Sequence, residues 1–132
     1  ALGLPREITQ RIPFPGPALA ARVIDEVTPA RVAKVRKATE IVEQELAATR
    51  AFQYFAVLMS DKATGMRNYK RDFGDIVVVR CIESLDARKA TATELPWSKL
   101  RRLSARLSKE VPGCVRVLYD LTSKPPATVE FV

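Results

Sequence analysis

Two amphipathic helices stand out in the pattern of hydrophobic and polar positions along the chain. Apolar residues recur at three- and four-residue intervals over residues 29–48, which predicts a helix with one buried stripe. Thr28 followed by Pro29 predicts its N-terminus, because a hydroxyl cap and a proline in the first turn both suit a helix start. A second stripe begins after Pro96 and ends before Pro112, which predicts another helix. The residues expected to be buried are Val32, Val35, Ala38, Val42 and Leu46 in the first helix, and Trp97, Leu100, Leu103, Leu107 and Val111 in the second.

Five further segments have the alternation, or the dense apolar run, that is typical of β-strands. The β-branched run at residues 76–79 predicts that the third of them is the central strand. We expect the second and third segments to form an antiparallel hairpin, with a polar and basic loop over residues 60–73. The five predicted strands are residues 21–27, 52–59, 75–82, 115–121 and 128–131.

The order of these elements is strand, helix, two strands, helix and two strands, which predicts an α+β fold. We expect a two-layer sandwich in which the helices pack on one face of a mostly antiparallel sheet. The 132 residues, 47% of them hydrophobic, suffice for one domain with a modest core. Because such a sheet leaves an edge or a face uncovered, we expect a second copy of the chain to cover it in a homodimer.

Prolines restrict the backbone in two other segments. Three of them lie within residues 11–19 and predict an extended connector, which follows a short helical turn at residues 5–10. Pro125 and Pro126 predict a stiff elbow around Lys124, between the last two strands. A lysine on a stiff segment loses little entropy when it binds an anion. Arg116 and Glu130 would add a second cation and a carboxylate, which suits a phosphate ester that also donates hydrogen bonds.

Histidine is missing from the sequence, which removes the commonest general base and metal ligand. We therefore expect no catalytic residue, metal or cofactor in this domain. Cys81 and Cys114 are expected to be small buried thiols in a reducing compartment, the cytoplasm. The sequence has no run of 18 apolar residues that would predict a membrane span. The first residue is Ala1 and not methionine, and no signal-peptide pattern follows it. Both observations favour a processed chain or a piece of a longer protein.

A net charge of +7 raises the alternative of a basic RNA-binding module. Such a module would need interleaved exposed aromatic residues or a clamp, and no Gly-x-x-Gly loop occurs in the sequence. A solvated helix face is the commoner cause of a basic cluster, so the charge favours an anionic ligand without favouring nucleic acid. The basic residues of the second predicted helix are Lys99, Arg101, Arg102, Arg106 and Lys109.

Both ends of the chain resemble the GMP synthase family. Residues 119–128, Tyr-Asp-Leu-Thr-Ser-Lys-Pro-Pro-Ala-Thr, are similar to the last residues of that family. Residues 2–5, Leu-Gly-Leu-Pro, and residues 11–19, Arg-Ile-Pro-Phe-Pro-Gly-Pro-Ala-Leu, are similar to the family's Gly-Leu-Pro and Arg-His-Pro-Phe-Pro-Gly-Pro-Gly-Leu. The resemblance implies that residues 1–20 are a linker from an ATP-pyrophosphatase domain and that residues 21–132 are the C-terminal dimerisation domain.

The resemblance also implies a function, the binding of xanthosine monophosphate (XMP) and homodimerisation in the ATP-dependent amination of XMP to GMP. Arg116 and Lys124 would contact the phosphate of XMP, and Glu130 would accept hydrogen bonds from its ribose or base. Arg67 and Arg71, in the predicted basic loop, are further candidates. The complete glutamine-hydrolysing ligase would need ATP and Mg, an ATP-pyrophosphatase domain or subunit, and a glutamine amidotransferase domain or subunit.

The sequence departs from the family pattern at four places. Ile12 replaces a histidine, Ala18 replaces a glycine, and Asn68-Tyr69 replaces the Gly-Asp of a Gly-Val-x-Gly-Asp-x-Arg loop. The ending Phe131-Val132 replaces an aromatic residue followed by an acid. These departures leave open two alternatives: a degenerate paralogue retained only for dimerisation, and a basic loop that is simply solvated.

Overall fold

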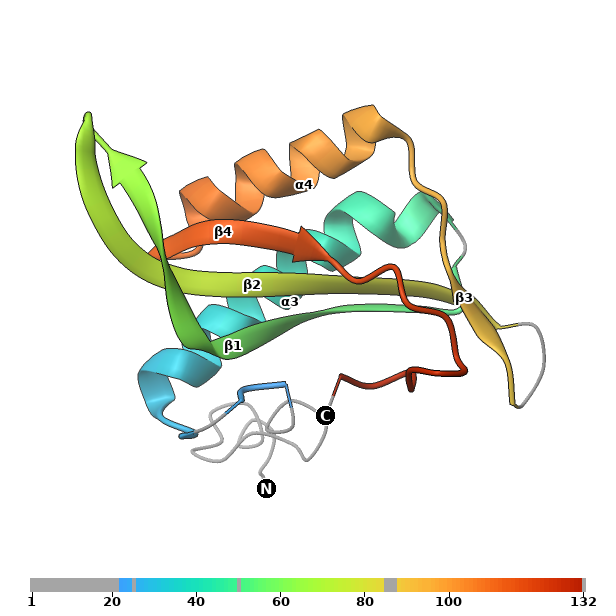
Figure 1. The fold of residues 1–132 in the computed structure, drawn as a ribbon. Coiled ribbons are helices and arrows are strands. Elements are labelled where there is room, and N and C mark those ends of the chain that lie inside the picture. Colours follow the sequence, from blue (N-terminus) through green and yellow to red (C-terminus); the bar gives the residue numbers. More distant parts are fainter. Residues whose placement is uncertain (1–21, 25, 50, 85–87, 132) are drawn as a thin grey trace, which may run out of the picture.

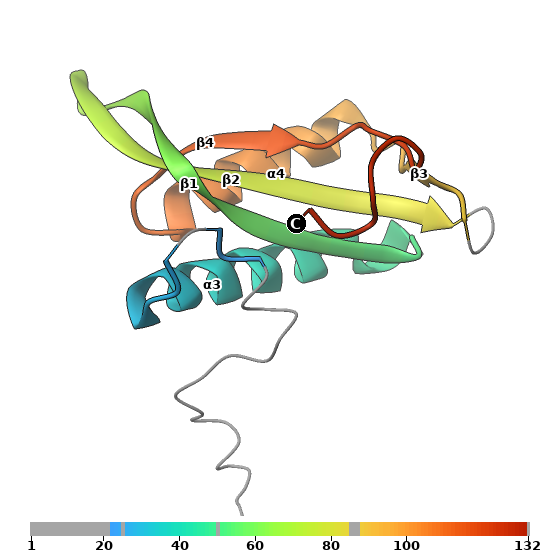
Figure 2. The ribbon, with the colours of Figure 1, turned by 60° about the horizontal axis from the view of Figure 1, so that its bottom comes forward.

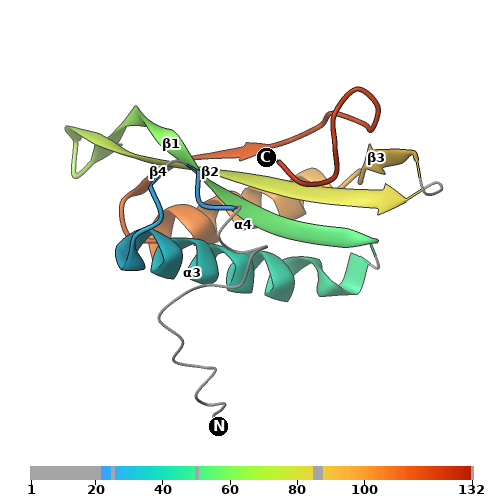
Figure 3. The same ribbon diagram turned by 90° about the horizontal axis from the view of Figure 1, so that it is seen from below.

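The computed structural model describes residues 22–24, 26–49, 51–84 and 88–131. Within these residues, two helices and a four-stranded sheet form two layers, and both helices lie on the same face of the sheet (Figures 1 and 3). This arrangement confirms the predicted α+β sandwich. The predicted helical turn at residues 5–10, the connector at 11–19 and the linker over residues 1–20 lie outside the described residues. The elements are α3 (Pro29–Leu46), a 3-10 turn η1 (Ala47–Thr49), β1 (Gln53–Arg67), β2 (Lys70–Ser84), β3 (Ala90–Ala92), α4 (Trp97–Glu110) and β4 (Cys114–Tyr119).

Strand β2 is the centre of the sheet, as its β-branched run predicts. It pairs antiparallel with β1 on one side. On its other side it pairs antiparallel with β3 and parallel with β4. Strand β4 is parallel to β2 because the crossover through α4 carries the chain back to the end of the sheet at which β2 begins.

Helix α3 has the cap and the buried stripe that the sequence predicts. The amide N–H of Arg31 donates to Oγ1 of Thr28 at 3.2 Å, and Pro29 occupies the first turn. All five predicted stripe residues are buried, and Ile41 is buried with them. They pack with α4 and with one face of the sheet to form the main core.

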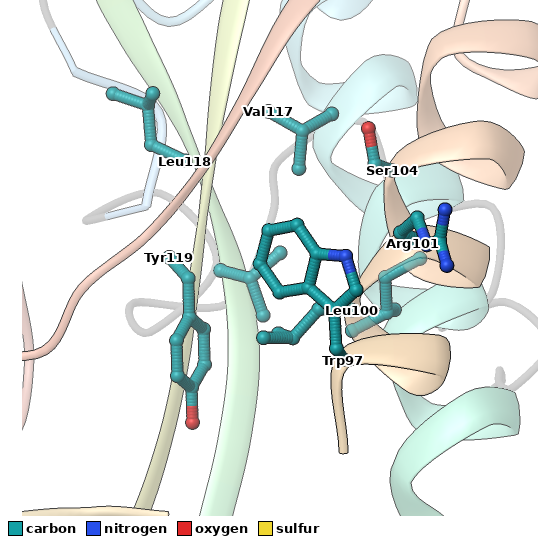
Figure 4. A pocket seen from close by; sticks show the side chains of 9 residues that line it. Trp97, Leu100, Arg101, Ser104, Val117, Leu118 and Tyr119 are labelled. Atoms are coloured by element: carbon teal, nitrogen blue, oxygen red, sulfur yellow. The ribbon is translucent and has the colours of Figure 1, made fainter. Parts of the chain in front are cut away.

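Helix α4 ends at Glu110, before Pro112, as predicted, and its inner face carries Leu103 and Leu107. The prediction that Trp97 belongs to the buried stripe is wrong, because this first residue of the helix is 68% exposed. Trp97 lies beside an apolar groove of about 360 Å³ between α4 and β4. Figure 4 shows Trp97 and Ser104 of α4 close to Val117 and Tyr119 of β4.

The β1–β2 hairpin is longer than predicted, and the prediction of a loop over residues 60–73 is wrong. Both strands continue to a two-residue turn at Asn68 and Tyr69, whose φ angles are 51° and 63°. Two positive φ angles are what a tight hairpin turn requires. The outer part of the hairpin projects past both helices in Figures 1 and 3. Since most residues of this outer part are exposed, they lack the apolar alternation by which a strand is recognised.

Two predicted strands are not regular strands in the structure. Among the described residues of 21–27, only Val23 pairs, in a single parallel bridge with Leu58. Residues 128–131 form no strand, because the carbonyl groups of Thr128 and Val129 accept hydrogen bonds from the side chain of Arg80. Residues 120–131, named here the C-terminal segment, therefore cross the second face of the sheet as an irregular chain (Figure 2).

Candidate functional site

Lys124 lies at the centre of the C-terminal segment and is fixed through its own backbone. Its amide N–H donates to the carbonyl oxygen of Ala90 at 2.8 Å, and the N–H of Ala90 donates back to the carbonyl of Lys124 at 3.0 Å. The Lys124–Pro125 and Pro125–Pro126 peptide bonds are both cis. The half-buried Lys124 lines a small hollow of about 110 Å³ together with Lys89. The structure thus brings two lysines together at one end of the sheet.

Arg80 of β2 holds the C-terminal segment against the sheet. Its side chain is 0% exposed. Its guanidinium meets carbonyl groups on both sides of the proline pair, and the carboxylate of Asp120 lies 3.5 Å from Nη1. The four acceptors are the carbonyl oxygens of Thr122 at 2.6 Å and Asp120 at 3.3 Å from Nη1, of Thr128 at 2.8 Å from Nη2, and of Val129 at 3.4 Å from Nε.

Glu130 is engaged by two side chains from elsewhere in the chain. Arg22 donates to both of its carboxylate oxygens, from Nε at 3.1 Å and from Nη2 at 2.7 Å. Gln53 Nε2 adds a longer bond of 3.4 Å, and the Arg22 guanidinium stacks 4.0 Å from the ring centroid of Phe55. A carboxylate has about four acceptor positions, so Glu130 retains capacity for a ligand donor beside Arg22.

The other three candidates lie on the hairpin side of the sheet. Arg116, in β4, donates from Nε and Nη2 to the carbonyl oxygen of Thr64 at 3.2 and 3.0 Å. Arg67 donates to Asp72 Oδ2 and to the carbonyl oxygen of Cys114, both at 2.7 Å. Arg71 is exposed.

The five candidates do not meet at one point within a single chain. Arg116 lies opposite Ile76 of β2, whereas Lys124 pairs with Ala90, which lies opposite Ser84. At about 3.3 Å per residue of strand, these two positions on β2 are about 25 Å apart. Lys124 and Glu130 share one segment, and Arg116 belongs to a separate group with Arg67 and Arg71.

A second set of charges joins the hairpin to α3. Asp75 is 2% exposed, and its carboxylate accepts from Lys34 Nζ at 2.5 Å and from Lys62 Nζ at 2.8 Å. Burial alone would raise the pKa of Asp75, but the hydrogen bonds and charges of the two lysines outweigh burial, so its pKa lies below the ordinary value of 3.8. Asp75 is therefore ionised at neutral pH and acts as a structural anion.

The basic cluster of α4 is partly balanced by acidic residues. Glu45 of α3 lies within 4 Å of Lys99, Arg102 and Arg106, and Arg106 also pairs with Glu110. These ion pairs favour the interpretation of a solvated helix face over that of a nucleic-acid surface.

Neither cysteine has the surroundings of a reactive thiol. Cys81 and Cys114 are free and buried, as predicted, and burial raises the pKa of both thiols. In the described part of the chain, no group of three or more His, Cys, Asp or Glu side chains is placed to hold a metal ion. None of the described helices has both the length and the apolar character that a membrane crossing requires.

Arg80 and Arg22 are the site residues that the sequence analysis missed. Arg80 follows the apolar run of the central strand, and a charged residue between Val78 and Ile82 is the one signal that could have singled it out. Arg22 carries no comparable signal, because its partner Glu130 lies 108 positions away.

The fold and these contacts define a class of domain: a small α+β unit whose candidate chemistry is recognition of an anion by fixed cations. Residues 39–131 match the family model described as GMP synthase C terminal domain, and the chain belongs to that family. This result confirms the resemblance seen at the two ends of the sequence.

Curated relatives give the same result over nearly the whole chain, and each is named as one subunit of glutamine-hydrolyzing GMP synthase. The protein from Thermococcus kodakarensis is 51% identical over 98% of this chain, and that from Methanopyrus kandleri is 48% identical over 98%. The protein of the same name from Methanocella arvoryzae is 50% identical over 99% of the chain. The chain spans 43–44% of the length of these three relatives.

Proposed function

We propose that this chain contributes XMP binding and homodimerisation to a glutamine-hydrolysing GMP synthase, a cytoplasmic ligase that aminates XMP to GMP. Membership of the family supports the reaction, and the fixed position of Lys124 supports the site. Because the backbone of Lys124 is held before any ligand arrives, only its side chain loses conformational entropy when the ammonium binds a phosphate. This fixed lysine is the observation that carries the proposal.

Each site residue has a distinct role in this proposal. Lys124 binds the phosphate of XMP, and Lys89 adds positive charge to the same hollow. Glu130 accepts a hydrogen bond from the ribose or the base, while Arg22 keeps its carboxylate in place. Arg116, about 25 Å away along β2, would reach the same phosphate only from a second copy of the chain. Arg67 and Arg71 would then approach from that copy as well.

The remaining chemistry is assigned to other domains or subunits. Activation of XMP by ATP and Mg would belong to an ATP-pyrophosphatase domain or subunit, and ammonia would come from a glutamine amidotransferase. The relatives are each named as one subunit of the synthase, which implies that those proteins work with another subunit. For this chain, we propose that it binds no cofactor of its own.

The substitution Lys124→Ala tests the proposal in a complete synthase that contains this domain. A charge-assisted hydrogen bond contributes about 1.5–3 kcal/mol, so the KM for XMP should rise about tenfold to a hundredfold and GMP formation at low XMP should nearly cease. The KM for ATP should stay the same, and sedimentation should show an intact dimer. Lys109→Ala, at the C-terminal end of α4, is the matched control and should change neither constant.

A titration of the chain by NMR separates binding from turnover. Signals of the C-terminal segment should shift saturably with XMP at low salt, less with inorganic phosphate, and not at all in the Lys124→Ala variant. An unchanged KM for XMP in that variant, together with unchanged shifts, would remove Lys124 from the substrate site.

A further inference from the structure

We propose that Arg80 is a positioning residue for XMP, because it holds the C-terminal segment in the shape that presents Lys124. This inference rests on the proposed function, because Arg80 can help to position XMP only if Lys124 binds its phosphate. Arg80 itself is covered by the segment and is 0% exposed, so it acts through the segment and not on the ligand.

The geometry of the guanidinium makes this assignment specific. Two of its acceptors precede Lys124 in the chain, and two follow the proline pair. One side chain therefore closes the loop that carries the lysine, while the paired backbone bonds to Ala90 fix the loop from the outer side. Without the guanidinium, the four carbonyl oxygens would lose their common donor.

An arginine suits this position and a lysine does not. Guanidinium carries five N–H donors in a planar fork, so that it can bond in two directions at once. An ammonium group has three donors on one nitrogen and cannot span both groups of carbonyls. The side chain is also buried, so water cannot easily replace the missing bonds.

This mechanism predicts an effect on XMP binding and not on turnover. A segment that samples several shapes has the binding shape for only part of the time, and the apparent affinity falls by that fraction. Saturating XMP restores the binding shape, so kcat is retained. The site for ATP is not touched.

The test is the substitution Arg80→Lys in a complete synthase that contains this domain. The KM for XMP should rise about tenfold, as for a segment that is correctly shaped about a tenth of the time. The kcat and the KM for ATP should remain within about twofold. The matched control is Arg106→Lys, because Arg106 also donates several hydrogen bonds, but to Glu45 and Glu110 on the helix layer. This control should leave the KM for XMP unchanged.

Amide hydrogen exchange gives an independent readout on the 132-residue chain. In Arg80→Lys, the amides of Lys124 and Ala127 should exchange faster, because each depends on the closed segment for its bond. The amides of α3 should keep their protection. If Arg80→Lys does not fold, Asp120→Asn replaces it, since this change weakens the 3.5 Å ion pair with Arg80 and keeps a side-chain oxygen that can accept from the amide N–H of Thr122. It should raise the KM for XMP about threefold.

Three outcomes separate the two proposals. If Lys124→Ala leaves the KM for XMP unchanged, the proposed function and the role of Arg80 both fail. If Lys124→Ala raises this KM while Arg80→Lys and Asp120→Asn do not, only the role of Arg80 is overturned. If Arg80→Lys lowers kcat and also removes the exchange protection of α3, Arg80 is a structural residue and the positioning role is overturned.

Discussion

The two faces of the sheet are covered in different ways. On one face, α3 and α4 bury aliphatic side chains such as Val42 and Leu107, and burial of this kind needs no particular direction. On the other face, a small apolar cluster around Phe55 is covered by an irregular segment, which is held by directed bonds from Arg80 and Arg22. The helix-covered face holds most of the buried apolar side chains, so we expect it to contribute most of the stability. We expect single polar substitutions on the other face to loosen the segment while the helix layer stays packed.

The largest expected effect comes from a cavity on the helix-covered face. Leu107→Ala should lower the free energy of unfolding by about 3 kcal/mol, because Leu107 has no exposed surface and its loss leaves a void. Denaturant unfolding measures this change. Leu118→Ala removes a half-exposed leucine from β4 and should cost less than about 1 kcal/mol. Equal costs for the two leucines would contradict the importance of helix packing.

The next effect concerns a strongly polar contact on the helix-covered face. Asp75→Asn should lower the free energy of unfolding by about 2 kcal/mol at neutral pH, because Lys34 and Lys62 lose their charged acceptor. The pKa of Asp75 is lower in the folded chain than in the unfolded chain, so its stabilisation is present above about pH 3.8 and is lost as the pH falls further. Urea unfolding at pH 7 and at several values below pH 4 measures both effects.

The variant should therefore lose less stability than the original chain as the pH falls below 3.8. Asp72→Asn is the control, because Asp72 pairs with Arg67 on the exposed hairpin. If the free energy of unfolding changed with pH in the same way for the original chain and for Asp75→Asn, the two lysines would not lower the pKa of Asp75.

On the segment-covered face, Glu130→Gln should weaken the bonds with Arg22 and destabilise the docked C-terminal segment by about 1 kcal/mol. This destabilisation should be local, so that the amide of Ala127 exchanges faster while the unfolding midpoint moves little. Exchange monitored by NMR measures it, with the exposed Glu26→Gln as the control. A uniform increase in exchange across α3 would show that the two faces are not independent.

The smallest expected effect is a partial recovery of activity, which tests whether two chains share one site. Under the proposed function, Arg116→Ala and Lys124→Ala chains should each be impaired, because each lacks one of the proposed phosphate contacts. If the contacts come from different copies, a mixed dimer has one intact site and one doubly defective site. Half of the dimers in an equal mixture are mixed, so about a quarter of all sites should work. No recovery after mixing would place Arg116 outside the Lys124 site.

Local sequence patterns were sufficient for two elements. The one-sided apolar stripe and the Thr28-Pro29 start predicted α3, and the β-branched run at residues 76–79 predicted β2 as the central strand, which is buried on both faces there. Periodicity failed for the outer hairpin, most of whose residues are exposed. It also failed at Trp97, where the first turn of α4 passes the edge of the core.

The candidate site shows another limit of sequence reasoning. The stiff elbow at Lys124 was predictable, since proline restricts the backbone whatever surrounds it. The hydrogen bonds from Arg80 that hold this elbow were not predictable. Every residue carries a carbonyl acceptor, and the sequence does not show which of them Arg80 contacts. The five candidate residues were chosen for their side-chain chemistry and from the family resemblance. Neither criterion gives the distance between Arg116 and Lys124 along the sheet.

The pair between Arg22 and Glu130 has a consequence for the order in which the chain folds. Its members are separated by 108 positions, so it forms only after the intervening sheet has brought them together. During synthesis on the ribosome, the C-terminal segment emerges after the helices and strands described above. We therefore expect the segment to dock onto a preformed sheet, so that the proposed nucleotide site at Lys124 forms after the sheet. Under the proposed function, binding of XMP would then report that the C-terminal segment has docked.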